Sequence, residues 1–259
     1  MTPRGGTGNR LLAALPASDL DLLGPELEVI ALDQDAVLSR AGDDIEYVFF
    51  PHSGAISLMI DMADGRTVAT AVIGREGAVG TLSVLGSSPS AITAVVRAAG
   101  TAARIPASRF HVAFSRSPAI RSAVQTHIRA MLIQFQLGSA CNALHPVEAR
   151  MARWLLQLGD RVDHDVLPLT QQALSQILGV RRTTVTLLMR NLRARGAIRS
   201  DRRGLIEIDR ARLAAAACEC HNVMRLEVEE IFSMNSVQSR AAVLREDGRI
   251  PEIEPGDAM

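Results

Sequence analysis

The sequence predicts an α+β protein with an N-terminal antiparallel β-roll, one long helix and a C-terminal winged helix-turn-helix. Short β-prone runs fill residues 27–106, a helical pattern follows, and signals for helix, glycine turn, helix and hairpin succeed one another over 169–208. A length of 259 residues suits two domains. We expect a β-roll domain at 9–116, a dimerisation helix at 117–145, a winged helix-turn-helix domain at 146–232 and a disordered tail at 233–259.

The N-terminal part begins with two short helical stretches in residues 9–24, the second with Ser18 as its N-cap and an end near Gly24. Residues 27–106 then consist of runs of β-branched and apolar residues, separated by Gly, Asp and Pro. Asp64-Gly65 between two such runs predicts a hairpin. The six runs predict an antiparallel roll, and they are VIAL, YVFFP, AISLMI, TVATAVI, AITAVV and TAARIP.

A long helix follows, with Ser117 as N-cap and Pro118 at its first position. His145-Pro146 ends it. Its apolar residues recur at spacings of three and four, which favours packing against a second copy of the helix, although the same stripe would also cover the core of the β-roll. The stripe consists of Ile120, Val124, Ile128, Met131, Phe135 and Gly138.

The segment 169–208 predicts the helix-turn-helix and its wing. Thr170 caps a first helix, and Gly179 supplies the positive φ that ends it. A second helix over 181–195 has an apolar face and a polar first turn, and a hairpin of 198–200 with 205–208 follows it. One further helix is expected from about Leu213 to Glu230.

Charge is concentrated in this segment. The formal net charge of the chain is zero, which argues against a wholly basic nucleic-acid protein. Between Thr170 and Ile206, however, eight arginines stand against one acid, Asp201. This excess is typical of a surface that neutralises phosphates, with a solvated helical face or a plain helical hairpin as the alternatives.

In this arrangement the second helix enters the major groove end-on, so its first turns meet base edges. Arginine pairs with guanine, and threonine methyls contact thymine. Arg202 and Arg203 at the hairpin tip suit phosphate contacts. The expected base-contacting residues are Arg181, Arg182, Thr183, Thr184 and Thr186.

With these residues placed, the chain from Asn9 to Val228 resembles the Crp/Fnr superfamily of bacterial transcription regulators, most strongly in LTQQALSQILGVRRTTVTLLMRNL. The resemblance implies a cyclic-nucleotide-binding-like sensor roll, a homodimer and double-stranded DNA as partner. It also implies that Thr170 and Gln172 contact phosphates. Arg182, Thr183 and Leu187 would occupy the positions where founding members carry Arg, Glu and Arg, so the DNA site is expected to differ from theirs.

The sensor domain departs from the resemblance. Ile92, followed by Thr93, stands where cyclic-nucleotide-binding members carry the arginine for the cyclic phosphate, and Thr81 stands at the ribose carboxylate. Cyclic AMP in the usual mode is therefore not expected. The glycine-rich segment GREGAVG, residues 74–80, is expected either to bind another anionic small molecule or to form a loop without a ligand. The candidate effector residues are Arg75, Glu76, Gly77, Gly80, Thr81, Thr93 and Arg97.

The three cysteines do not suggest a disulfide framework. Oxygen-sensing members of the superfamily carry clustered N-terminal cysteines, and none precedes Cys141 here. Cys218-x-Cys220 followed by His221 has the ligand types of a metal site but lacks a fourth ligand. Cys141 with His145 would approach that pair only through folding. The expectation is therefore small buried residues and no metal.

Other classes fit less well. No run approaches the 18 apolar residues of a membrane span, which predicts a cytoplasmic protein. A cupin-type enzyme would need clustered histidines in the roll, whereas His52 and His111 lie far apart in sequence, so we expect no enzyme. The remaining alternative is an effector-binding module whose C-terminal domain mainly docks a protein such as RNA polymerase.

Overall fold

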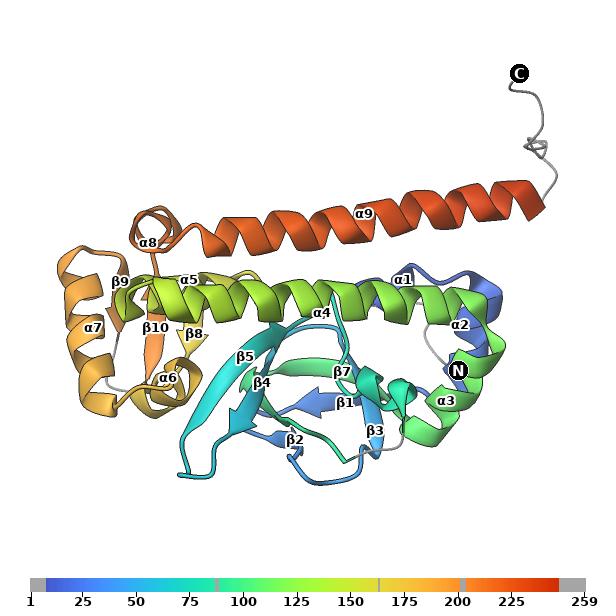
Figure 1. Cartoon of the computed structure of the whole chain (residues 1–259), viewed down its shortest axis with the longest axis horizontal. Helices are drawn as coiled ribbons and strands as arrows, with labels where there is room; N and C mark the ends of the chain where they lie inside the picture. The colour runs from blue at the N-terminus through green and yellow to red at the C-terminus, as the bar shows by residue number, and fades with distance from the viewer. Residues whose placement is uncertain (1–7, 87–88, 163, 201–203, 247–259) are drawn as a thin grey trace, which may run out of the picture.

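The computed structural model describes residues 8–86, 89–162, 164–200 and 204–246. Helix α4 runs through the middle of the molecule, with the β-roll on one side, helix α9 alongside the other, and the winged helix-turn-helix at its C-terminal end (Figure 1). The predicted α+β fold class is confirmed. No helix within these described ranges is long and apolar enough to cross a membrane.

Two short helices precede the roll, as predicted. Asn9 caps the first, because its side chain accepts hydrogen bonds from the Leu11 and Leu12 amides. The prediction that Ser18 caps the second is wrong, since Pro16 takes that position and Ser18 lies inside the helix. Proline fixes φ near the value a helix entry needs and so starts the helix earlier. The helices are α1 Arg10–Ala13, α2 Ala17–Leu23 and the 3-10 turn η1 Gly24–Glu26.

The roll consists of two antiparallel sheets with strand orders β1-β7-β3 and β2-β6-β4-β5. Each of the six predicted runs forms a strand, and the predicted hairpin joins β4 to β5 with Gly65 at φ 79°. Strand β2 and the turn η2 were not predicted, because they are too short to show a period. The bounds are β1 Glu28–Leu32, β2 Val37–Ser39, β3 Tyr47–Pro51, β4 Ala55–Asp61, β5 Thr67–Ile73, η2 Thr81–Leu85, β6 Thr93–Ala98 and β7 Gly100–Pro106.

Helix α3, Ala107–Arg116, was not predicted, and α4, Pro118–Leu144, begins and ends where expected. The Ile120 amide donates to Ser117 Oγ at 3.0 Å, which confirms the predicted cap. The apolar stripe of α4 packs against the roll. Ile120 and Val124 pack into one core cluster of the roll and Met131 into another. The alternative prediction, that this stripe covers the core of the β-roll, agrees with the structure.

The C-terminal domain combines helices with a three-stranded sheet of order β8-β10-β9. Its core extends into the roll, because Met59, Val72 and Val95 belong to the same buried cluster as the winged-helix residues. The two domains are therefore packed together. The bounds are α5 Val147–Gly159, β8 Val166–Pro168, α6 Gln171–Leu178, α7 Arg182–Ala194, β9 Ile198–Ser200 and β10 Leu205–Ile208.

The region after Asp209 differs from the prediction of one helix. Helix α8, Arg210–Ala216, ends at Ala217, and α9, Cys220–Glu246, starts anew and runs antiparallel along α4 (Figure 1). Residues 233–246, expected to be disordered, belong to α9. The rest of that expected tail, 247–259, lies outside the described residues. Tertiary packing against α4 supports a helix that shows no strong amphipathic period of its own.

Candidate nucleic-acid interface

Helix α6 is the first helix of the helix-turn-helix, and both of its predicted ends are confirmed. Thr170 Oγ1 accepts a hydrogen bond from the Ala173 amide at 3.1 Å. Gly179 ends the helix in the left-handed region at φ 65°. Buried Leu174 and Ile177 hold α6 in the domain core. The left-handed residue therefore ends α6 and lets the chain turn into α7, which packs against α6.

Helix α7 presents two different faces. Val185, Leu188 and Leu192 are buried in the domain core, as the sequence predicted. Arg181 and Arg182 are exposed at its N-terminus. On the same side Thr183 and Thr186 are exposed, Thr184 is half-buried, and Leu187 is 47% exposed. An exposed leucine beside two arginines suits contact with both a thymine methyl and guanine edges.

Contacts between secondary-structure elements fix the direction of α7. Thr186 Oγ1 donates to Gln171 Oε1 on α6 at 2.9 Å. Arg193 Nε donates to Ser200 Oγ on β9 at 2.9 Å. The wing strands β9 and β10 pair as predicted, and β8 adds a third strand that the sequence analysis missed. The predicted phosphate contacts Arg202 and Arg203 lie outside the described residues.

A cavity of about 370 Å³, here called the interdomain cavity, lies between part of α6 and the roll. The expected phosphate-contacting residues Thr170 and Gln172 line it from the C-terminal side. Asp35 and Asp61 line it from the roll, so two carboxylates share the space with them. The side chains at its rim and walls include Thr93, Val95, Arg97, Ala173 and Gln176.

Arg97 is the main polar link across this cavity. It is 5% exposed, pairs with Asp35 at 3.2 Å, and donates to Gln176 Oε1 on α6 at 3.2 Å. Burial lowers the pKa of Arg97, and the Asp35 carboxylate opposes that shift. A second link lies nearby, since Gln34 Nε2 donates to the carbonyl oxygen of Pro168 at 2.8 Å. These contacts hold the helix-turn-helix against the roll.

A second cavity, of about 210 Å³, lies where the loop after β5 meets α4, α5 and α9, and is here called the α4–α9 cavity. Arg161 of the C-terminal domain pairs there with Glu76 of the sensor domain at 2.9 Å. Both side chains are largely buried, at 12% and 15% exposure. The other basic residues around this cavity are Arg10, Arg75, His221 and Arg225.

The seven candidate effector residues do not form one site. Arg75 and Glu76 line the α4–α9 cavity, whereas Thr93 and Arg97 line the interdomain cavity. The remaining three, Gly77, Gly80 and Thr81, are packed into the roll. A Cβ on Gly77 would lie 2.8 Å from His127 Cε1, and Thr81 is 1% exposed. These residues were predicted to form one anion site, but the folded chain places them in two cavities and in the interior of the roll.

Gly80 is required in this loop by its backbone conformation and its close packing. It adopts φ +89°, and a Cβ there would lie 2.6 Å from the Tyr47 carbonyl oxygen. Gly80→Ala is therefore expected to lower the free energy of unfolding by more than the about 1–2 kcal/mol that a left-handed residue costs. Gly65→Ala is the matched control, since Gly65 has φ +79° but open space around it. Urea denaturation of both variants measures the difference, and equal losses would contradict the packing argument.

Comparison with known proteins agrees with this architecture. One family model, the cyclic nucleotide-binding domain, matches residues 29–117, and another, the Crp-like helix-turn-helix domain, matches residues 149–216. The chain belongs to the Crp/Fnr superfamily. No curated protein matches the sequence closely enough to be reported as a relative.

Solved structures of Crp/Fnr-type fold are similar to the chain at low identity. FixK2 from Bradyrhizobium japonicum is 18% identical, with a TM-score of 0.61 over 74% of this chain and 98% of that one. CLP, a c-di-GMP responsive global regulator from Xanthomonas campestris, is 18% identical, with a TM-score of 0.61 over 75% and 100%. A CRP/FNR family transcriptional regulator from Thermus thermophilus is 20% identical, with a TM-score of 0.61 over 73% and 98%. These likenesses show the fold.

The Crp/Fnr sensor segment around Ile92 is closed by its own contacts. Ile92 packs against a core cluster inside the roll. Ser90 Oγ donates to the Ile92 carbonyl oxygen at 2.8 Å, and Thr93 Oγ1 donates to Asp61 Oδ2 at 2.6 Å. The position at which the resemblance expects a phosphate-binding arginine therefore holds a side chain packed on an apolar cluster, and the Thr93 hydroxyl beside it is bonded to a carboxylate.

The cysteines depart most from the prediction. Cys141, Cys218 and Cys220 come together with His145, and their ligand atoms lie within 4.8 Å of one another. The adjacent histidine in sequence, His221, points elsewhere and bonds to Asp160 Oδ2 at 2.8 Å. The sequence held these ligand types, but only the approach of α9 to the end of α4 brings them together.

Proposed function

We propose that this chain is a sequence-specific DNA-binding transcription regulator that acts as a homodimer. The observation that carries the proposal is the exposed N-terminal part of α7, where Arg181 and Arg182 are followed by Thr183 and the 47%-exposed Leu187. A helix whose opposite face is fully packed has no structural use for two arginines at this end. Bidentate arginine contacts to guanine and apolar contacts to thymine are the chemistry that such a surface supports.

The docked position of α6 supports a regulated switch. Thr170 and Gln172 share the interdomain cavity with Asp35 and Asp61. A DNA phosphate that approached these two residues would meet the Asp61 carboxylate, which repels it, while the Asp35 carboxylate is paired with Arg97. We infer that the helix-turn-helix must move away from the roll before it binds DNA fully. The Arg97–Gln176 contact then stabilises the state that binds DNA less well.

This switch has a direct test. A hydrogen bond to a charged group contributes about 1.5 kcal/mol, which is roughly a tenfold change in an equilibrium. Gln176→Ala is expected to tighten DNA binding by up to about tenfold through release of the docked state. Arg97→Gln weakens the same contact from the roll and leaves every residue of the DNA-binding domain unchanged. Fluorescence anisotropy with a labelled operator should show both variants moving in the same direction, and two unchanged affinities would contradict the switch.

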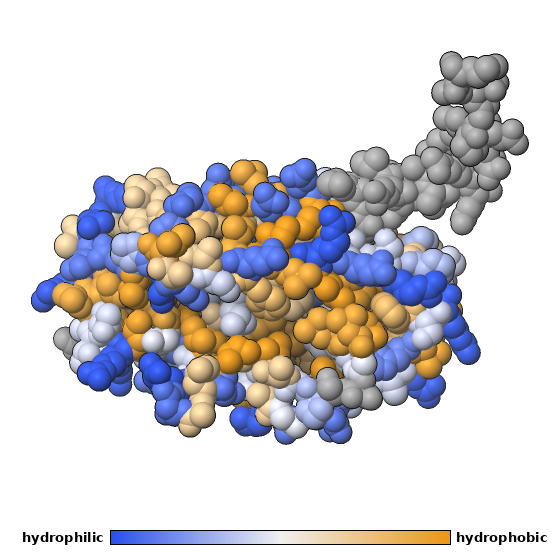
Figure 2. Space-filling view, viewed as in Figure 1, coloured by the Kyte–Doolittle hydropathy of each residue, from blue (hydrophilic) through white to orange (hydrophobic). Residues whose placement is uncertain are grey.

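The proposed homodimer uses the solvent-facing side of α4 together with α9. One face of α4 covers the roll and another contacts α9, so a third face remains. Leu132 on α4 and Leu226 on α9 are each 51% exposed. Figure 2 shows apolar side chains among polar ones on the face that these helices cross. Light scattering on the purified chain is expected to give twice the chain mass, and a Leu132→Glu variant is expected to shift that mass toward one chain.

For the sensor domain we infer that cyclic AMP is not bound in the usual mode. Ile92 cannot neutralise a phosphate, and it is packed into the roll. The α4–α9 cavity of about 210 Å³ is below the size range of typical small-molecule sites, about 300–1,000 Å³. Glu76, Asp160 and Glu229 line it beside its arginines, so a small anion would have to compete with these carboxylates for the basic side chains. The α4–α9 cavity is lined by α5, by α9 and by the loop after β5. An anion bound in it would therefore change the contact between the two domains.

Localisation, catalysis and protein docking remain to be assigned. A DNA-binding regulator of this kind acts in the cytoplasm, and catalysis is not proposed. His111 Nε2 lies 3.0 Å from Ser83 Oγ, while His52 lies just after β3, so the pair offers no clustered ligand set for a cupin-type reaction. Docking of a protein such as RNA polymerase is the alternative use of the C-terminal domain. It would not need the basic N-terminus of α7.

The deciding experiment is selection of bound sites from random duplex DNA by the purified chain, with binding measured at several salt concentrations. A homodimer is expected to enrich a palindrome with half-sites about one helical turn, roughly 34–36 Å, apart. Affinity should fall steeply with salt because phosphate contacts release counterions. Absence of any enriched sequence, together with binding to RNA polymerase, would favour the protein-docking alternative.

A further inference from the structure

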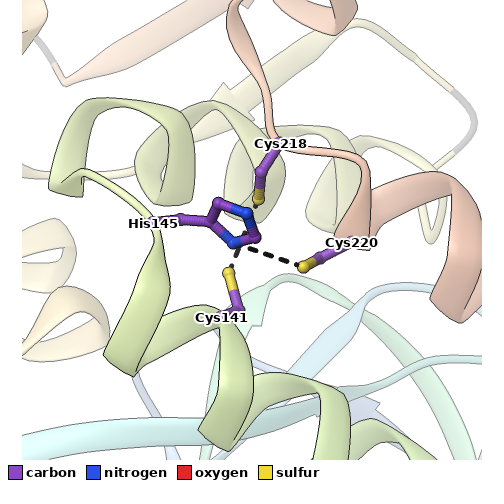
Figure 3. Close-up of side chains that lie close together, drawn as sticks. All are labelled: Cys141, His145, Cys218 and Cys220. Carbon is purple, nitrogen blue, oxygen red and sulfur yellow. Dashed lines mark hydrogen bonds between the residues drawn. The ribbon is translucent and has the colours of Figure 1, made fainter.

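A compact cluster of soft ligands lies at the junction between the two domains. Cys141 stands in the last turn of α4 and His145 at its C-cap, while Cys218 precedes α9 and Cys220 is its first residue. Figure 3 shows the four side chains converging from these two chain segments. Cys141 Sγ lies 3.5 Å from Cys218 Sγ, and Cys220 Sγ lies 3.5 Å from His145 Nδ1.

These separations match tetrahedral coordination. Thiolate ligands lie about 2.3 Å from zinc, which places two sulfurs of one tetrahedron about 3.8 Å apart. A disulfide would instead need sulfurs at about 2.05 Å, and all three cysteines are free. A two-iron cluster would separate its pairs of ligands further, because two metal ions lie between them. The four ligand atoms here all fall within 4.8 Å of one another.

The surroundings of the cluster support the same assignment. His145 turns Nδ1 toward the cysteines, while its Nε2 lies 3.2 Å from Glu219 Oε1. A carboxylate on the far nitrogen of a ligand histidine is the arrangement that orients such ligands in zinc sites. The cysteines are buried, and Met224 packs against them.

We propose that Cys141, His145, Cys218 and Cys220 bind one zinc-like divalent cation in tetrahedral coordination. Three thiolates and one imidazole are the ligand types that zinc selects. None of these four residues lies in α7 or lines the interdomain cavity or the α4–α9 cavity. Cys218 and Cys220 also lie just beyond the residues 149–216 matched by the helix-turn-helix family model. The site therefore depends on the C-terminal extension of this chain.

The position of the cation gives it a structural role. It joins the end of α4, where the chain passes at Pro146 into the C-terminal domain, to the start of α9. A bound cation would hold α9 along α4 and fix the angle between α4 and the helix α5 that follows Pro146. Metal binding would therefore stabilise the folded chain by an amount that grows with the ratio of metal concentration to Kd.

The test uses the reduced full-length chain, stripped of metal with a chelator and titrated with Co²⁺ in the absence of DNA. One Co²⁺ per chain is expected, with the intense absorption of tetrahedral cobalt–thiolate coordination, and Zn²⁺ should displace it. Cys218→Ser is expected to weaken binding by more than 100-fold, and Glu219→Gln, which removes only the outer carboxylate, by about 10–100-fold. His221→Gln, a histidine beside Cys220 but outside the cluster, is the matched control and should bind as the parent does.

Folding of each variant is checked separately. Cys220→His keeps four ligands, so it should retain Co²⁺ with an altered spectrum, even if Cys218→Ser unfolds. Zn²⁺ is expected to raise the Tm of the parent and of His221→Gln. The proposal is overturned if the stripped parent binds no Co²⁺ at micromolar concentration, if folded Cys218→Ser binds it equally well, or if the purified chain carries an iron–sulfur chromophore. None of these outcomes depends on DNA binding.

Discussion

Replacing Arg182 with alanine is expected to weaken operator binding by about 1–3 kcal/mol and to relax the preference at one base pair. Arg182 is the first residue of α7, is exposed, and stands where a bidentate contact to guanine is made in this docking geometry. Loss of such a contact affects one sequence position, because the rest of the helix still enters the groove. Competition binding with the selected operator and its single-base variants measures both effects.

Arg190→Ala is the control for charge alone. Arg190 is exposed on the same helix but two turns further along, away from the N-terminal end that meets the bases. Its loss should weaken all sequences alike and lower the salt dependence, with no change of preference. If Arg182→Ala bound the operator and its variants as the parent does, the proposed docking of α7 would be wrong.

The free energy of unfolding is expected to fall by about 3 kcal/mol as the pH is lowered from 7 to 4, through His127 alone. Burial lowers the pKa of His127 to about 4 from 6.5, despite its bond to the Ala78 carbonyl oxygen. Below pH 6.5 the unfolded chain therefore binds a proton that the folded chain binds only near pH 4. Stability is full above pH 6.5 and is lost between these two values.

His127→Gln removes this titration and keeps a donor for the Ala78 carbonyl oxygen, which lies 2.8 Å from His127 Nε2. Urea denaturation across pH 4–7 should give a flatter curve for this variant than for the parent. His164→Asn is the control, because His164 is exposed. A parent and His127→Gln with the same slope would show that the histidine is not buried in its neutral form.

Several elements were predictable because their signals are local. Thr170 as N-cap, Gly179 in the left-handed region and the hairpin at Asp64-Gly65 each depend on residues within four positions of one another. The six strands and the buried face of α7 followed from their periods. Short or weakly periodic elements, such as β2, β8 and the second half of α9, carried too little local signal and were missed.

The sequence by itself determined the fold class, the order of the domains and the basic, exposed start of α7. Only the tertiary structure decided what the stripe on α4 covers, which cavity each candidate effector residue lines, and that Cys141 meets Cys218 across 77 positions. The physical reason is the range of the interactions. Caps, turns and periods act within one element, whereas a ligand cluster or a cavity depends on how several elements pack, and no segment of the sequence encodes that alone.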